Sequence, residues 1–275
     1  MDDIGGTMRR VQRRQLLWQG LVGAGALTLG PRALQSLAGP APLVDLSGAV
    51  PIATSVAPPP VISRAQWGAN ESLRRGAPEF APLRRAIVHH TVTATNESDP
   101  VGRVRAIYEF HTRGRGWSDI AYNFVVDGAG RVYEGRRGAS GAPDGEDGSG
   151  RGVIGAHAKG HNTGSVGIAM LGTYSDGRVV PTDAALDAVA AVVAWKFGPR
   201  SIDPRSPGAL VGHRDVVATG CPGDGLYHRL PELRDRAQAR IVPPVLIAPS
   251  DDGGLIENLL DLVVDVPDVP LLGGI

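Results

Sequence analysis

Short β-branched runs alternate with helix-patterned segments between Val61 and Ile241, and this alternation limits the possible folds more than any other feature. The predicted strands cover residues 86–92, 121–126, 131–133 and 165–171, and the predicted helices cover residues 101–111, 182–197 and 230–241. The Asp-Gly-Ala-Gly sequence at 127–130 predicts a hairpin between the second and third strands. Strands that alternate with helices predict one α/β layer structure.

The first 38 residues have the layout of an export signal. Several arginines precede an apolar run over residues 16–29, and Ser36-Leu37-Ala38 offers a cleavage site flanked by small residues. The sequence Arg13-Arg14-Gln15-Leu16-Leu17 resembles the twin-arginine export signature. We therefore expect an exported protein, secreted or associated with the cell wall. An uncleaved membrane anchor is the alternative.

Composition divides the rest of the chain into a linker, one domain and a tail. Residues 39–60 are rich in proline and predict a linker, whereas residues 61–240 carry the patterned sequence of a domain. Residues 241–275 contain acidic but no basic side chains, which predicts a mostly disordered tail. Within the domain, residues 138–152 are almost all small or polar, which predicts a flexible surface insertion.

Charge and hydropathy exclude two classes of protein. The formal net charge is 0, and it becomes about −3 when the leader is removed with its five arginines and two aspartates. Neither value supports a nucleic-acid-binding protein that relies on a basic surface. The chain has no uninterrupted apolar run of about 18 residues, which excludes a multi-span membrane protein. We expect no integral membrane domain once the signal is cleaved.

Cys221 is the only cysteine, and it follows His213 by eight residues. An exported protein meets oxidising conditions, in which an unpaired thiol is a liability. A lone cysteine beside a histidine is typical of a metal ligand or of a nucleophile. The alternative is a small buried apolar residue, but glycine and proline on both sides of Cys221 do not resemble a buried strand or helix.

Two histidines end the first predicted strand. Side chains alternate along a strand, so only one of His89 and His90 can face a given site, and Thr91 shares the face of His89. One strand histidine, His213 and Cys221 would leave a fourth position open, as in catalytic zinc sites. Zinc suits this donor set better than copper. Histidines that only form hydrogen bonds, or a Cys-His nucleophile pair, are the alternatives, but no nucleophile elbow accompanies Cys221.

Six motifs occur in an order that closely resembles the type-2 N-acetylmuramoyl-L-alanine amidases and peptidoglycan recognition proteins. The resemblance covers about residues 61–236. The motifs are Val88-His89-His90-Thr91, the Gly116–Phe124 segment Gly-Trp-Ser-Asp-Ile-Ala-Tyr-Asn-Phe, Gly130–Arg136, Gly155-Ala156-His157-Ala158, Gly164–Ile168 and the His213–Pro222 stretch.

The resemblance implies a single domain with a mixed central sheet flanked by helices and with disordered tails. It implies zinc-dependent hydrolysis of the amide between N-acetylmuramic acid and L-alanine in peptidoglycan. His89, His213 and Cys221 match the zinc ligands, Tyr122 matches a tyrosine that assists at the scissile amide, and Thr219 matches a position that orients water or substrate. The residues that match contacts to the muropeptide are His90, Thr91, His111, Arg115, His157 and Asn162.

The resemblance also leaves two other functions open. Relatives that only recognise peptidoglycan usually lack the cysteine ligand, so Cys221 favours catalysis over a non-catalytic peptidoglycan-binding module. A zinc hydrolase of this fold that acts on another amide is the third reading.

Overall fold

The computed structural model describes residues 50–51, 56–241 and 246–247. The predicted leader (1–38) and most of the predicted linker and acidic tail lie outside the described residues. Two short strands, β1 (Val50–Pro51) and β10 (Leu246–Ile247), pair antiparallel. None of the described helices combines the length and hydrophobicity needed to cross a bilayer.

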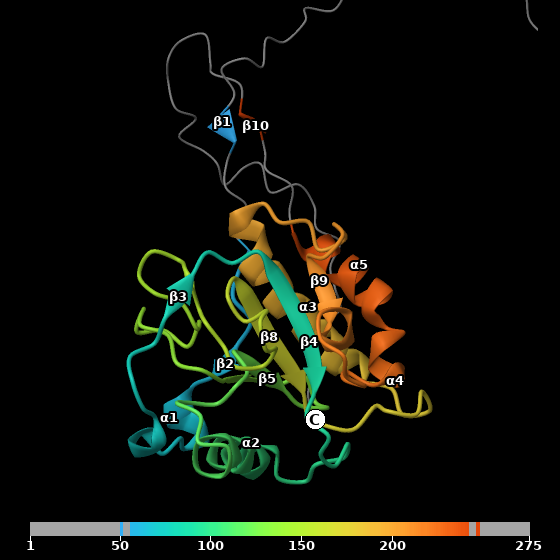
Figure 1. Ribbon diagram of the computed structural model, residues 1–275. Coiled ribbons are helices and arrows are strands. Elements are labelled where there is room, and N and C mark those ends of the chain that lie inside the picture. Colours follow the sequence, from blue (N-terminus) through green and yellow to red (C-terminus); the bar gives the residue numbers. More distant parts are fainter. Residues whose placement is uncertain (1–49, 52–55, 242–245, 248–275) are drawn as a thin grey trace, which may run out of the picture. The chain divides into compact units, whose positions relative to one another are not determined.

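A six-stranded mixed sheet forms the centre of the domain (Figure 1). Its order is β2 (Val61–Ile62), β6 (Val132–Glu134), β5 (Phe124–Val126), β8 (Ser165–Met170), β4 (Arg85–His90) and β9 (Leu210–Gly212). Only the β5–β6 hairpin is antiparallel, and the other neighbours are parallel. A separate antiparallel pair consists of β3 (Phe80–Ala81) and β7 (Gly152–Val153). The structure confirms the predicted α/β fold and the predicted hairpin.

The helices occupy the segments that periodicity predicts. The longer ones are α2 (Pro100–Glu109), α3 (Asp183–Phe197) and α5 (Leu230–Arg240). The shorter helices and turns are α1 (Arg64–Trp67), η1 (Glu71–Leu73), η2 (Phe110–Gly114), η3 (Gly198–Arg200), η4 (His213–Asp215) and α4 (Asp224–Tyr227). The Thr182 side chain accepts a hydrogen bond from the Ala185 N–H and so caps α3, as predicted. The α-helical part of the predicted helix over 101–111 ends at Glu109, and the chain then continues into the π-helical turn η2.

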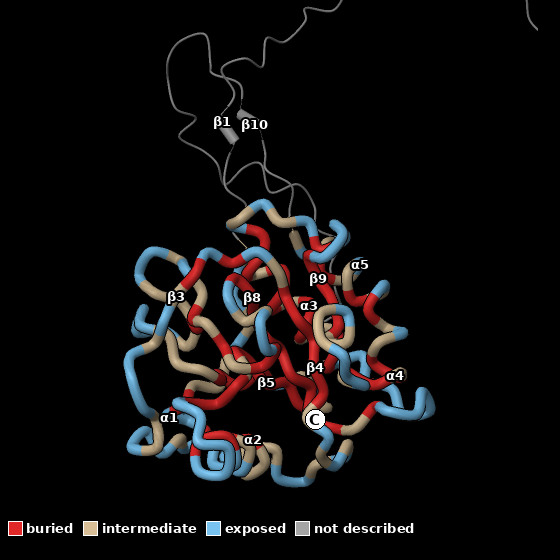
Figure 2. Tube along the Cα trace, in the orientation of Figure 1, coloured by how far each residue is buried: buried red, intermediate tan, exposed pale blue. Residues whose placement is uncertain are grey.

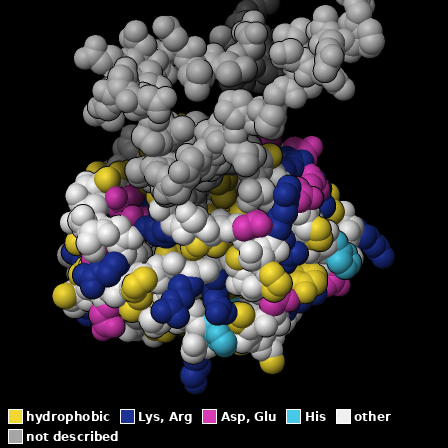
Figure 3. Space-filling view, turned by 90° about the horizontal axis from the view of Figure 1, so that it is seen from above, with side chains coloured by type: hydrophobic (Ala, Val, Ile, Leu, Met, Phe, Trp, Pro, Cys, Tyr) yellow, Lys and Arg dark blue, Asp and Glu magenta, His cyan; other side chains and the backbone are white. Residues whose placement is uncertain are grey.

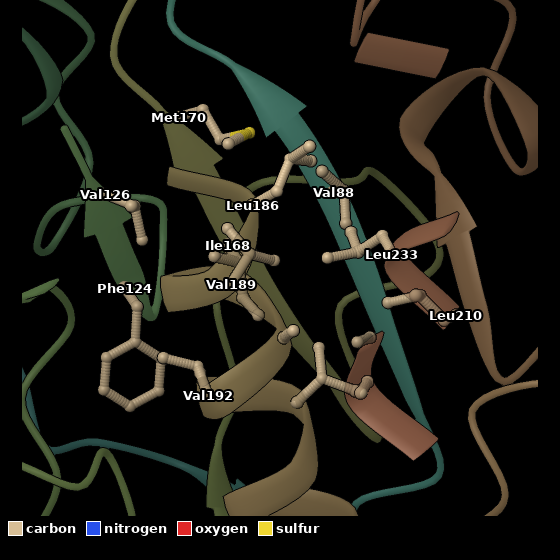
Figure 4. Packing of buried hydrophobic residues seen from close by; sticks show 14 of the residues in the cluster. Val88, Phe124, Val126, Ile168, Met170, Leu186, Val189, Val192, Leu210 and Leu233 are labelled. Carbon is tan, nitrogen blue, oxygen red and sulfur yellow. The ribbon is translucent and has the colours of Figure 1, made fainter. Parts of the chain in front are cut away.

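Helices α3 and α5 cover one face of the sheet. Val88 of β4 and Ile168 of β8 belong to the same buried cluster as Leu186 and Val189 of α3 and Leu233 of α5 (Figure 4). Burying one such aliphatic side chain fully contributes about 1.5–3 kcal/mol. The central strands are accordingly buried along their length (Figure 2).

Exposed ion pairs add to the attachment of α5 to α3. Arg236 of α5 lies 2.7 Å from Asp183 and 3.0 Å from Asp187 of α3. Figure 3 shows cationic and anionic side chains interspersed on the face that it presents. Such exposed pairs contribute about 0–1 kcal/mol each, so the apolar contacts dominate.

The other face of the sheet is covered in part by α1 and α2, through Trp67, Val104 and Tyr108 packed against Val125 and Tyr133. Alternate residues of β4 point to opposite faces, so His89 lies on the side away from Val88 and α3. Its neighbour Ile87 belongs to a separate small cluster with Ala158 and Val211. The strand therefore presents His89 on the face that α3 and α5 leave free.

The segment 138–152 is anchored to α3, contrary to the predicted flexible insertion. Glu146 accepts a hydrogen bond from Lys196 Nζ at 2.8 Å, and the lysine side chain is buried. The Asp147 carboxylate accepts hydrogen bonds from the backbone N–H groups of Ser149 and Arg151. Composition indicated a loop correctly, but the ion pair that holds it comes from a helix about fifty residues away in sequence.

Candidate metal centre

Three side chains, from the end of one strand, the turn after its neighbour and one loop, converge at the free face of the sheet. His89 lies near the end of β4, His213 directly follows β9, and Cys221 lies in the loop after η4. Strands β4 and β9 are parallel neighbours, so their C-terminal ends bring the two histidines together. One ligand atom from each of the three residues lies within 4.8 Å of the others, and His89 Nδ1 lies 3.7 Å from Cys221 Sγ. The three predicted ligands are close enough to share one ion.

The loop that carries Cys221 folds back onto η4, and Cys221 lies in neither a strand nor a helix, in agreement with the glycine and proline on both sides of it. The Arg214 N–H donates to the Cys221 carbonyl at 2.9 Å, and the Arg214 guanidinium donates to the Gly220 carbonyl at 2.6 Å. A Cβ atom at Gly212 would lie 3.0 Å from both Pro222 and Tyr227. Glycine at this position therefore allows the backbone to approach the loop closely.

The donor set fits a zinc ion. His213 Nε2 is buried and has no hydrogen-bond partner within the part of the chain that the structure describes. Burial raises the pKa of the Cys221 thiol to about 11. Burial, together with His157 and His213, lowers the pKa of His89. Without a cation the site would hold two neutral imidazoles and a neutral thiol with an unsatisfied nitrogen. Two imidazoles and a thiolate are the ligands of catalytic zinc sites that keep one position open.

His157 is a buried neighbour of the His89 ring, whereas the sequence predicted a residue that contacts the muropeptide. The two rings meet edge to face, with His89 Nε2 at 3.0 Å from His157 Nδ1. If His89 Nδ1 held a cation, the ring proton would be on Nε2, which would then donate to His157. Burial, with His213 and Arg136, lowers the pKa of His157 to about 3, so His157 is neutral and can accept. His157 is only 7% exposed, and it orients His89.

The substitution Gly167→Ala is expected to disturb this arrangement. A Cβ atom at Gly167 would lie 2.3–2.5 Å from three atoms of the His157 ring, so the ring must leave the position in which it contacts His89. Loss of such an orienting partner lowers metal affinity by about 10–100-fold. Competition with a chromophoric zinc chelator measures this change. Gly152→Ala is the matched control, because its Cβ would meet only atoms at 3.9 Å. Equal zinc affinities in the two variants would contradict the assigned role of His157.

Tyr122 and His111 border the metal site on the side of α2. The Tyr122 ring centroid lies 5.4 Å from that of His89 and 5.6 Å from that of His111. Burial, with the nearby Cys221, raises the pKa of Tyr122, so its hydroxyl keeps its proton. The Ala121 N–H donates to His111 Nδ1 at 3.2 Å, which leaves the proton on Nε2. Burial, with Arg115 and Arg136, lowers the pKa of His111 to about 4, so this ring is a neutral donor.

The other predicted site residues have different positions. Thr219 is exposed and its hydroxyl accepts from the Cys221 N–H at 3.2 Å. The exposed Arg115 places its guanidinium 5.2 Å from the Phe110 ring centre. The Asn162 side chain accepts from the backbone N–H groups of His157 and Ala158, each at 2.8 Å. Asn162 therefore shapes the turn that carries His157.

His90 lies on the opposite face of β4 from His89, and Thr91 follows the strand directly. His90 Nδ1 accepts from the Tyr174 N–H at 3.3 Å, on the α3 side of the sheet. Strand β4 ends at His90, but the Thr91 N–H still donates to the Met170 carbonyl of β8 at 3.1 Å. The Thr91 hydroxyl accepts from the Gly172 N–H at 3.1 Å. The prediction that the two histidines point in different directions is confirmed. The placement of Thr91 on the face of His89 stays a prediction.

Sequence reasoning assigned no role to two groups beside the site. Trp117 stacks against His111 with ring centres 4.9 Å apart and is 36% exposed. Arg136 donates its backbone N–H to the Tyr122 carbonyl and lines a cavity of about 180 Å³ with Arg74, Arg75 and Arg137. The signal for Trp117 was an aromatic residue in a loop between Gly116 and Ser118. The arginines are spread over more than sixty residues, so no local pattern groups them.

Comparisons with known proteins agree with this geometry. The family model described as N-acetylmuramoyl-L-alanine amidase (Amidase_2) matches residues 79–224. The chain is 35% identical to the human N-acetylmuramoyl-L-alanine amidase, over 62% of this chain and 28% of the human protein. It is 35% identical to peptidoglycan-recognition protein 1 of Holotrichia diomphalia, over 62% of this chain and 79% of that protein. The chain thus spans less than a third of the human enzyme's length.

A solved structure shows the same fold. Peptidoglycan recognition protein LE, in complex with tracheal cytotoxin, a monomeric diaminopimelic acid-type peptidoglycan, superposes with a TM-score of 0.51 at 30% identity. The match covers 62% of this chain and 92% of that structure. The family model spans more than half of the chain and includes all three candidate ligands, His89, His213 and Cys221. The chain belongs to the N-acetylmuramoyl-L-alanine amidase family, and its α/β domain has the fold of the peptidoglycan recognition proteins.

Proposed function

We propose that this protein is a zinc-dependent N-acetylmuramoyl-L-alanine amidase that cuts the amide between N-acetylmuramic acid and L-alanine in peptidoglycan. The observation that carries the proposal is the cluster of His89, His213 and Cys221, with ligand atoms within 4.8 Å and a buried nitrogen that has no partner among the described residues. The family membership supports the substrate. The export signal proposed for residues 1–38 would deliver the enzyme to the cell wall through the twin-arginine pathway.

Several residues of the chain have separate roles around the ion. A zinc ion in such a site supplies a Lewis acid and lowers the pKa of bound water from 15.7 to about 7. His157 holds the His89 ring in the orientation that directs Nδ1 at the site. The protonated Tyr122 hydroxyl donates a hydrogen bond to the scissile carbonyl oxygen as negative charge develops there. His111 offers Nε2–H to the bound substrate, and the exposed Thr219 positions substrate or water beside Cys221.

Tyr122→Phe is expected to lower kcat by about 10²–10³-fold, because one donor to a developing oxyanion is lost. The zinc content should not change, because Tyr122 is not among the ligands. Steady-state kinetics on a defined muropeptide, with metal analysis of the same sample, measures both quantities. Tyr108→Phe is the control, since its hydroxyl donates to the Asn70 carbonyl away from the site. If both variants kept the wild-type kcat, Tyr122 would not be the donor.

The decisive experiment combines metal analysis with product mass. The purified full chain should contain about one zinc per molecule. Incubation with purified muropeptides should release a stem peptide with a free L-alanine amine and a saccharide that retains its lactyl group. Mass spectrometry identifies these products. Binding of the muropeptide without any mass change would instead indicate a recognition module. Cleavage of a different amide would indicate another substrate class.

A further inference from the structure

The three candidate ligands differ in how firmly the fold holds them. His89 belongs to β4, which is paired with a strand on each side, and its ring contacts the buried His157. His213 instead begins the short turn η4 after β9, and Cys221 lies in neither a strand nor a helix. The apparent Kd of a site rises as the fraction of molecules with the site already assembled falls. The affinity for a metal ion therefore depends on what fixes the positions of His213 and Cys221.

Tyr227 of α4 is bonded to the turn that carries His213. Its hydroxyl donates to Asp215 Oδ1 at 2.6 Å, and Asp215 Oδ2 accepts from the Gly212 N–H at 2.8 Å. Gly212 directly precedes His213, and Asp215 is the last residue of η4, so this carboxylate closes the turn around His213. Hydrogen bonds to an ionised acceptor are about twice as strong as those between neutral groups. Tyr227 therefore fixes the carboxylate on which the shape of the turn depends.

The same tyrosine is linked to the loop that carries Cys221. The centre of the Tyr227 ring lies 4.6 Å from the guanidinium carbon of Arg214. A cation over an aromatic ring is attracted by the negative charge of the ring face. Arg214 in turn donates its backbone N–H to the Cys221 carbonyl and its guanidinium to the Gly220 carbonyl. Tyr227 thus contacts the turn of one ligand directly and the loop of another through Arg214.

Tyr227 is itself held by the main apolar core. It packs, partly buried, against the cluster that α3 and α5 form with the sheet, and its neighbour Leu226 is fully buried in that cluster. Its ring also lies directly against the backbone at Gly212, where an added Cβ atom would be 3.0 Å from it. The ring therefore connects the two ligand-bearing segments to the most rigid part of the domain.

We propose that Tyr227 is a positioning residue that holds the His213 turn and the Cys221 loop in the arrangement that binds zinc. The inference rests on the proposed function, because it takes the three candidate ligands as the residues that hold the ion. Tyr227 is not one of these ligands and acts through Asp215 and Arg214. Its loss should therefore weaken zinc binding and leave the chemistry of the zinc-loaded enzyme unchanged.

The test is Tyr227→Phe in the full-length protein, which keeps the ring and removes only the bond to Asp215. Competition with a chromophoric chelator should show a zinc Kd about tenfold higher, at the lower end of the effect of orienting partners. At saturating zinc, kcat on a muropeptide should equal that of the wild type. Tyr133→Phe is the matched control, since it loses the same kind of bond, to Asp127 at 2.8 Å in the β5–β6 hairpin, and should keep the wild-type Kd. An unchanged Kd in Tyr227→Phe, or a low kcat at saturating zinc, would overturn the proposal.

A second variant tests whether the hydroxyl acts through the carboxylate. Asp215→Ala removes the partner of Tyr227, and residues of one hydrogen-bond network have effects that do not add. The zinc Kd of Asp215→Ala should therefore not rise further when Tyr227→Phe is added. A further tenfold rise would overturn the proposal, because Tyr227 would then act without closing the turn. Wild-type protein that binds zinc but cuts no muropeptide would contradict the amidase function and leave the positioning role standing, whereas wild-type protein that binds no zinc would contradict both.

Discussion

Replacing Cys221 by alanine is expected to strip the protein of zinc and to abolish amide hydrolysis. The change removes one of three ligand groups, and His89 and His213 alone leave the ion two-coordinate from the protein. Structural zinc sites with four ligands bind with about 10–16 kcal/mol, so one ligand corresponds to roughly 3 kcal/mol, or about a hundredfold in affinity. Metal analysis after dialysis against a weak chelator, followed by kinetics on a muropeptide, measures the loss.

A conservative variant separates ligand loss from damage to the loop. Cys221→Asp places a carboxylate, another zinc ligand, at the same position and should recover part of the bound zinc and of the activity. The Arg214 N–H donates to the backbone carbonyl of residue 221, so both variants keep the contact that folds the loop. A Cys221→Ala protein with full zinc content and full activity would refute the ligand assignment.

Arg64→Ala is expected to cost about 3–5 kcal/mol of the free energy of unfolding, because it breaks a buried ion-pair network from one side. The Arg64 side chain is fully buried, with Nε at 2.7 Å from Glu71 and one terminal nitrogen at 3.0 Å from Asp119. It also donates to the Gly135 carbonyl at 2.7 Å, and its guanidinium lies over the rings of Trp67 and Tyr108. The variant leaves the buried Asp119 without its cation.

The stability expected to be lost in Arg64→Ala is a large fraction of the total stability of a domain, which is about 5–15 kcal/mol. The Arg64→Ala substitution should also affect the metal site, because Asp119 accepts from the Ile120 N–H and so shapes the segment that leads to Tyr122. Urea unfolding measures the change. Arg205→Ala is the control, since its pair with Asp235 is exposed and should contribute less than about 1 kcal/mol. Similar losses in the two variants would show that the buried network does not stabilise the domain.

Local signals in the sequence predicted the α/β class, the longer helices and two of the three candidate ligands, His213 and Cys221, whereas the resemblance to the family selected His89 over His90. The β-branched run of β4, the Thr182 cap of α3 and the glycines around His213 act within a few residues, so they can be interpreted without the tertiary structure. The ligands were further marked by an unusual residue type, a single cysteine near a histidine.

The remaining features depend on contacts between distant segments. His157 meets His89 across 68 residues, so its role as an orienting partner has no local signature. Lys196 holds Glu146 from fifty residues away in sequence. Composition alone could not reveal this contact, so it predicted a flexible loop. The end of β4 at His90 depends on pairing with β8 and on the Thr91 contact to Gly172, and strand propensity continues past that point.

The convergence of β4, β9 and the Cys221 loop has a thermodynamic consequence. His89 and Cys221 are 132 residues apart in sequence, so an ion bound between them cross-links the first long strand of the sheet to a loop near the end of the domain. An ion that binds only the folded chain adds RT ln(1 + [L]/Kd), about 2.7 kcal/mol at a hundredfold excess over Kd. The resistance of this domain to heat and denaturant would then follow the free zinc concentration of its surroundings, and scarcity of the metal would weaken the fold and the chemistry together.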